Sequence, residues 1–110
     1  MKLLAYKYQV EGNPELWLKR AGYAMINDRQ SGETSFSRRL SRDFYPRFHI
    51  YVEELLSKNN EELVAFNLHL DQKKPGYEGQ SRHNAEYDGE VVEAEASRLS
   101  RFLLPANPFN

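Results

Sequence analysis

The sequence predicts an α+β fold, a four- or five-stranded antiparallel β-meander with a C-terminal α-helix packed on one face. Two observations support this prediction. Apolar residues occupy every second position in the runs 47–53 and 65–71, as in half-buried strands. Residues 88–104 instead carry apolar residues at helical spacing. The chain of 110 residues suits one domain, and we assign residues 1–104 to it and 105–110 to a C-terminal tail.

The N-terminal part of the chain has the less regular pattern. Apolar and polar residues alternate over residues 3–10, which predicts a strand. The asparagine–proline–glutamate sequence at 13–15 is typical of a helix start, so a short helix over 14–20 is one interpretation. A strand running from 16 through 26 is the other. The sequence leaves this choice open.

The middle of the chain predicts a series of antiparallel strands joined by polar turns. We expect strands over 22–28, 34–40, 45–53 and 63–71, with turns at 28–32, 41–43 and 57–61. Residues 72–88 show no periodicity, so a long loop is expected there.

The final element is the clearest helix. Asp88 can cap it, and Pro105 stops it. An apolar stripe predicts the buried side, formed by Val92, Ala96, Leu99 and Leu103. The acidic residues are expected at the helix start and on its solvated face, namely Glu86, Asp88, Glu90, Glu93 and Glu95.

Two histidines are expected to meet on the polar face of the sheet. A one-residue slip in strand register inverts which face meets the core, so the apolar positions of 45–53 and 63–71 must share a face. His49 and His69 then share the opposite face. A turn centred on Asn59 gives three facing pairs: Arg47 with Asp71, His49 with His69, and Tyr51 with Asn67.

The preceding reversal extends this face. If it is centred at Arg42 and Asp43, Arg38 lies beside Arg47 and Phe36 beside His49. Aromatic and convergent polar groups of this kind are typical of a ligand site. The candidate ligand-binding residues are Arg38, Tyr45, Arg47, His49, Tyr51, Asn67, His69 and Asp71.

Charge is distributed unevenly along the chain, although the net charge is only −1. Residues 29–52 have a net charge of +3, and residues 53–97 have one of −7. Because general nucleic-acid binding requires a basic domain, such a role would depend on the local arginine patch. The leading hypothesis is therefore a small cytoplasmic binding module for an anionic partner, either a phosphate-containing small molecule or a nucleic acid. No glycine-rich phosphate loop is present in the sequence.

A metal site is the alternative. His49, His69 and Asp71, joined by His83 or Glu86 from the loop, offer the imidazole and carboxylate ligands that zinc, iron or nickel accept. A divalent metal would then be the cofactor. The same residues could instead form a cross-strand polar group in which Arg47 bridges Asp71. In a third hypothesis the face is a subunit interface, possible in a homodimer.

Other features narrow the class of protein. The sequence has no cysteine, which excludes disulfides and thiolate metal sites and suits a reducing compartment, hence the expected cytoplasmic location. No apolar run is long enough to span a membrane, so no membrane partner is expected. The histidines could titrate near neutrality, but no nucleophile is evident, so a non-catalytic role is favoured and the question of an enzyme stays open.

Several motifs resemble a family of small bacterial proteins of unknown function. They are the string Phe44-Tyr45-Pro46-Arg47-Phe48-His49, the string His69-Leu70-Asp71-Gln72-Lys73-Lys74-Pro75, and Glu86-Tyr87-Asp88. The resemblance covers residues 20–103 and implies no activity, cofactor or partner. It also associates the loop with a second histidine where this chain has Ser81, which weakens a metal site that would need that histidine.

Overall fold

The computed structural model describes residues 1–27, 34–72, 85–86 and 88–106. It confirms the predicted α+β class. The strands are β1 (Lys2–Tyr6), β2 (Ala24–Asn27), β3 (Thr34–Arg39), β4 (Arg47–Leu56), β5 (Glu62–Asp71) and the two-residue β6 (Ala85–Glu86). The helices are α1 (Pro14–Arg20) and α2 (Glu90–Ser100), and a 3₁₀ turn spans Lys7–Val10.

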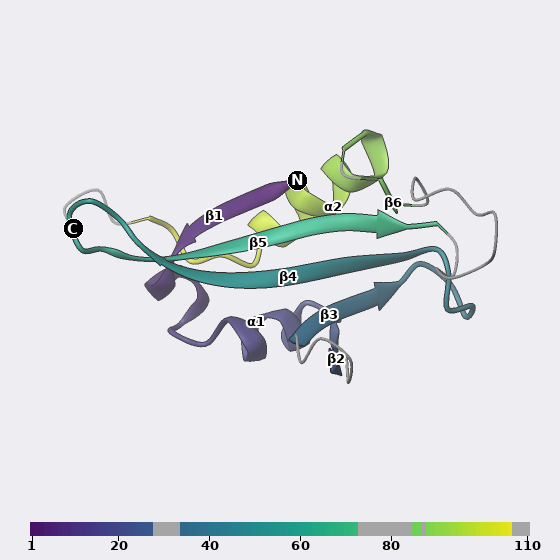
Figure 1. Ribbon diagram of the computed structural model, residues 1–110, viewed down its shortest axis with the longest axis horizontal. Helices are drawn as coiled ribbons and strands as arrows, with labels where there is room; N and C mark the ends of the chain where they lie inside the picture. Colours follow the sequence, from purple (N-terminus) through teal and green to yellow (C-terminus); the bar gives the residue numbers. More distant parts are fainter. Residues whose placement is uncertain (28–33, 73–84, 87, 107–110) are drawn as a thin grey trace.

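The sheet is antiparallel, with the strand order β1-β5-β4-β3-β2. Strands β2 to β5 form the predicted meander, whereas β1 pairs with the far side of β5 (Figure 1). β6 adds to the same side of β5 at Leu70 and Asp71. The chain therefore passes from one edge of the sheet to the other between β1 and β2, and α1 lies in this connection.

The hydrophobic core lies on one face of the sheet. Both helices contribute to it, Trp17 and Leu18 from α1 and Leu99 from α2, and they join Ile50 and Phe66 of the sheet. In Figure 1, α2 passes behind β1 and β5. The C-terminal helix packs on one face of the sheet, as predicted, and Phe48, Ile50 and Val52 lie on that face. The opposite face of β4 and β5 is left for the polar side chains.

The structure resolves the open choice near the N-terminus in favour of the helix. The side chain of Asn13 accepts a hydrogen bond from the backbone amide of Leu16, which caps α1. The predicted strand over 3–10 is wrong in its second half, because β1 ends at Tyr6 and a 3₁₀ turn follows. Gln9 explains this change, since its side chain accepts a hydrogen bond from the Tyr6 amide.

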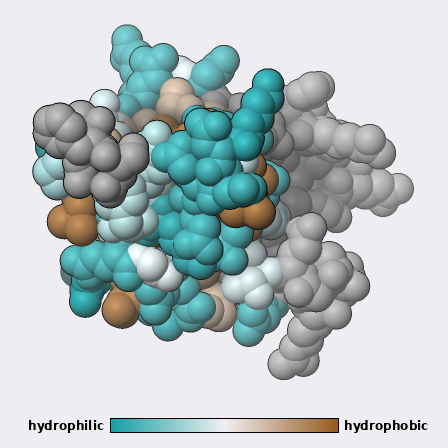
Figure 2. Space-filling model, turned by 90° about the vertical axis from the view of Figure 1, so that its left-hand side faces the viewer, coloured by the Kyte–Doolittle hydropathy of each residue, from teal (hydrophilic) through white to brown (hydrophobic). Residues whose placement is uncertain are grey.

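Other boundaries also differ from the predictions. α2 begins after Gly89 rather than Asp88 and ends at Ser100, before Pro105. β4 continues three residues beyond Glu53, so the β4–β5 hairpin reaches past the rest of the sheet (Figure 1). Viewed from this end, the surface is mostly hydrophilic with separate hydrophobic patches (Figure 2). Among the described residues, no helix is long and apolar enough to cross a membrane.

Candidate functional site

The two histidines meet as the parity argument predicted. In the register of β4 and β5, Arg47 faces Asp71, His49 faces His69, and Tyr51 faces Asn67. The imidazole rings have centroids 4.9 Å apart. These pairs lie on the polar face because Phe48 and Ile50 alternate with them into the core.

Asp71 is the centre of this group. Its Oδ1 lies 3.0 Å from Nε2 of His69, and its Oδ2 lies 3.2 Å from Nδ1 of His49. Arg47 Nε donates to the same Oδ2 over 3.3 Å. We call His49, His69 and Asp71 the histidine–aspartate triad. Its side chains keep between 11% and 16% of their surface exposed, so they are shielded but still accessible to solvent.

Ser35 completes the arrangement around His49. Its hydroxyl oxygen lies 2.7 Å from Nε2, the ring nitrogen that does not face Asp71. The Tyr51 ring packs against the same imidazole, with the centroids 4.7 Å apart. His49 is thus fixed on three sides, by Asp71, Ser35 and Tyr51.

The triad also sets the charge state of its carboxylate. Burial by itself would raise the pKa of Asp71, but the hydrogen bonds with His49 and His69 outweigh it and hold this pKa well below its usual range. Asp71 is therefore ionised throughout the physiological pH range, and its negative charge faces the guanidinium of Arg47.

The prediction for Arg38 is wrong by one residue of register. The structure pairs Arg39, not Arg38, with Arg47, and places Phe36 opposite Ile50 rather than beside His49. The reversal is centred on Asp43 instead of between Arg42 and Asp43. Because side chains alternate along a strand, this shift moves Arg38 to the helix-covered face of the sheet.

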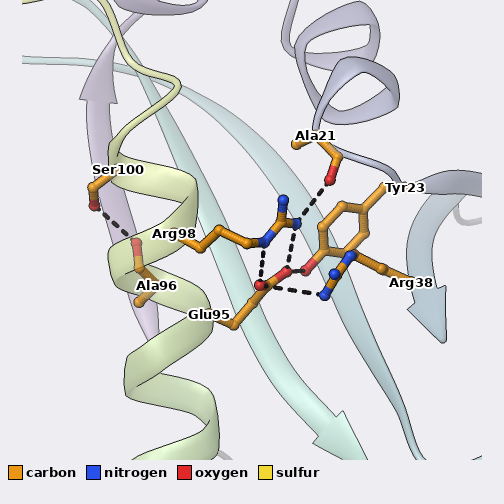
Figure 3. Close-up of polar contacts among 7 residues, drawn as sticks. All are labelled: Ala21, Tyr23, Arg38, Glu95, Ala96, Arg98 and Ser100. Carbon is orange, nitrogen blue, oxygen red and sulfur yellow. Dashed lines mark hydrogen bonds and ion pairs between the residues drawn. The ribbon is translucent and has the colours of Figure 1, made fainter. Parts of the chain in front are cut away.

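Arg38 instead joins a second polar cluster, centred on Glu95 of α2 (Figure 3). The Glu95 side chain is only 2% exposed. Its carboxylate accepts hydrogen bonds from Tyr23 Oη at 2.5 Å and from Arg98 Nε at 2.6 Å, and Arg38 Nη1 lies at 3.5 Å. Arg98 also donates to the carbonyl oxygen of Ala21. We call these side chains the Glu95 cluster.

The expectation that Glu95 lies on the solvated face of the helix is therefore wrong. Burial raises the pKa of Tyr23, and the hydrogen bond to Glu95 raises it further. The pKa of Arg98 is also raised, mainly by its hydrogen bond to Glu95. The positions of the apolar residues in α2 already indicate that Glu95 is buried, since it lies between Val92 and Leu99 on the buried side of the helix.

The remaining candidates occupy different surroundings. The guanidinium carbon of Arg47 lies over the Tyr45 ring, 4.8 Å from the ring centroid. Asn67 donates to Glu53 at 2.7 Å, so its amide is directed away from the triad. His83, the proposed loop ligand, lies outside the described residues. Ser35 was not among the predicted site residues.

The donor atoms of the triad lie close together. One nitrogen from each histidine and one carboxylate oxygen lie within 4.8 Å of one another. In a tetrahedral site with bonds of about 2.0 Å, neighbouring ligand atoms are about 3.3 Å apart. The distances of 3.0 Å from His69 Nε2 to Oδ1 and of 3.2 Å from His49 Nδ1 to Oδ2 are close to that value, and they involve the two different oxygens of the carboxylate.

Comparisons with known proteins give no independent information about this site. No family model matches the chain, and no curated protein or solved structure is significantly similar to it. The resemblance carried by the FYPRFH, HLDQKKP and EYD motifs therefore stays a prediction.

Proposed function

We propose that the protein binds a divalent transition-metal ion through His49, His69 and Asp71. The observation that carries this proposal is the convergence of two imidazole nitrogens and one carboxylate oxygen on facing strands. Two histidines and one carboxylate bind zinc or iron(II) in many proteins and leave coordination positions open to water or a further ligand.

The surroundings of the triad support the proposal. Metal-bound histidines usually donate their second ring N–H to an outer partner, and Ser35 lies where it can accept from His49 Nε2. Metal binding would require Nδ1 to release the proton that it donates to Asp71, so that its lone pair can bind the ion. The Arg47 guanidinium holds Oδ2 of Asp71, which leaves Oδ1 as the ligand atom.

The electrostatics limit the affinity that we expect. Arg47 already compensates the one carboxylate of the triad, so a divalent ion would add two uncompensated positive charges. An anion in an open coordination position, such as hydroxide, would reduce this excess. Protons compete with the metal for the histidine nitrogens, so the affinity should fall as the solution is acidified.

Metal analysis of protein purified without an affinity tag tests the proposal directly. The chelator-treated protein should bind one equivalent of zinc, nickel or iron(II) in a saturable titration. His69→Gln and Asp71→Asn should weaken that binding at least a hundredfold, whereas Asp43→Asn, an equivalent change at an exposed loop position, should leave it unchanged. Circular dichroism would verify that each variant is folded.

Two results would argue against the proposal. One is the lack of saturable binding for all three metals. The other is equal binding by Asp43→Asn and Asp71→Asn. His83→Ala adds a separate measurement, because a loss of affinity in this variant would show that the loop histidine is a fourth ligand.

The lack of cysteine is consistent with the reducing cytoplasm, which we propose as the location.

A further inference from the structure

A groove of about 800 Å³ lies at the β2–β3 edge of the sheet, next to the triad. Three arginines, Arg38, Arg39 and Arg47, line it together with Phe44. No acidic side chain is among the described residues that line it. The groove is of the size of a small-molecule site, and its charged lining is positive.

Arg39 and Arg47 face each other directly across β3 and β4. Like charges in this position normally destabilise a sheet. Here each guanidinium lies over an aromatic ring from the connecting loop, Arg39 at 3.9 Å from the centroid of Phe44 and Arg47 at 4.8 Å from that of Tyr45. The loop thus holds two positive groups close together at the groove.

The three arginines differ in how far their charge is compensated. Arg47 pairs with Asp71 of the triad, and Arg38 pairs with Glu95 on the other face. Arg39 pairs with no carboxylate among the residues that the structure describes, and its stacking on Phe44 leaves its positive charge available. The groove therefore retains a net positive charge that is centred on Arg39.

We propose that this arginine groove binds the phosphate group of a small phosphate-bearing molecule, with Arg39 as the principal contact and Arg47 as the second. Guanidinium forks match phosphate oxygens in pairs, and stacking on a ring orients the fork before the ligand arrives. Phe44 is 62% exposed, so it offers an apolar surface beside the phosphate position. The size of the groove suits a ligand no larger than a mononucleotide.

A small ligand fits these observations better than a nucleic acid. Strand-binding proteins need a positive surface that follows several phosphates, whereas the groove is one site at the sheet edge. The net charge of −1 also opposes general nucleic-acid binding. Binding of a phosphate in the arginine groove does not depend on a metal in the triad, although Arg47 borders both sites.

The test uses three probes, inorganic phosphate, pyrophosphate and adenosine monophosphate, titrated calorimetrically into chelator-treated protein. We expect saturable binding of at least one probe. Arg39→Gln should weaken it roughly tenfold to a hundredfold, as expected when a charged hydrogen-bonding partner is lost. Arg39→Lys should restore only part of the affinity, because lysine keeps the charge but loses the fork.

Arg42→Gln is the matched control, because Arg42 is exposed nearby but is not among the groove residues. It should change the affinity less than twofold. The proposal is overturned if none of the probes binds, if Arg42→Gln and Arg39→Gln weaken binding equally, or if a twelve-nucleotide single strand binds more tightly than every small probe. His69→Gln should lose the metal and keep phosphate binding, so failure of the metal proposal is distinguishable from failure of this one.

Discussion

Replacing Glu95 by glutamine should destabilise the fold strongly. The substitution keeps the size of the side chain and removes the charge that Tyr23, Arg38 and Arg98 all face. The carboxylate is buried, so water cannot replace it as a partner for these groups. Removing one partner of a buried ion pair costs about 3–5 kcal/mol in the free energy of unfolding.

The expected loss lies at the lower end of that range. The side chains of Arg38 and Arg98 are 34% and 27% exposed, so both can recover part of their hydration. The Tyr23 hydroxyl is buried, and its hydrogen bond to a charged group contributes about 1.5–3 kcal/mol. We therefore expect Glu95→Gln to lower the free energy of unfolding by about 3 kcal/mol.

Urea denaturation followed by circular dichroism measures this loss, and Glu93→Gln is the control. Glu93 lies on the same helix and carries the same charge, but it is exposed. Its substitution should cost about 0.5 kcal/mol through the helix dipole. A difference of less than 1 kcal/mol between the two variants would refute the argument that the Glu95 cluster stabilises the fold. Tyr23→Phe should lose about 2 kcal/mol and locate part of the effect.

Three further predictions concern the triad and the first helix. Because its pKa is lowered in the fold, Asp71 stabilises the protein above about pH 4, and this contribution is lost as the pH falls below that value. The stability difference between the wild type and Asp71→Asn should therefore shrink from pH 6 to pH 2.5 in urea titrations. A constant difference would contradict the lowered pKa. Ser35→Ala should weaken metal binding roughly tenfold to a hundredfold in a competition titration, because His49 loses its outer partner; an unchanged affinity would mean that Ser35 does not orient the ring. Asn13→Ala should cost about 1 kcal/mol of stability by removing the cap of α1, and Lys19→Ala, an exposed change in the last turn of the same helix, should cost less.

The pairing of β4 with β5 could be predicted because both strands carry apolar residues at every second position. Only one parity buries Phe48 and Ile50 together with Leu68, and it places His49 opposite His69. The predicted register of β3 against β4 is wrong because the same argument was not applied to Phe36. Phe36 is buried opposite Ile50, and this requirement excludes Arg38, which shares its face, as the neighbour of Arg47.

The Glu95 cluster is harder to predict from the sequence. Helical spacing places Glu95 on the buried side of α2, and Arg98 follows at a spacing that allows an ion pair. Its other partners come from elsewhere in the chain, Tyr23 from the segment before β2 and Arg38 from β3. Such long-range partners depend on how α2 lies across the sheet, which local patterns do not specify.

The two polar groups depend on one register of β3. A slip of one residue would turn Phe36 and Arg38 to the polar face and bring Ser35, Ser37 and Arg39 to the helix-covered face. Phe36 is buried in the observed register, and its exposure on the polar face disfavours the slipped pairing. The same register places Ser35 at His49 and Arg39 opposite Arg47 on the other face. Arg38, which belongs to the Glu95 cluster and also lines the arginine groove, therefore depends on the same register as Ser35 and Arg39.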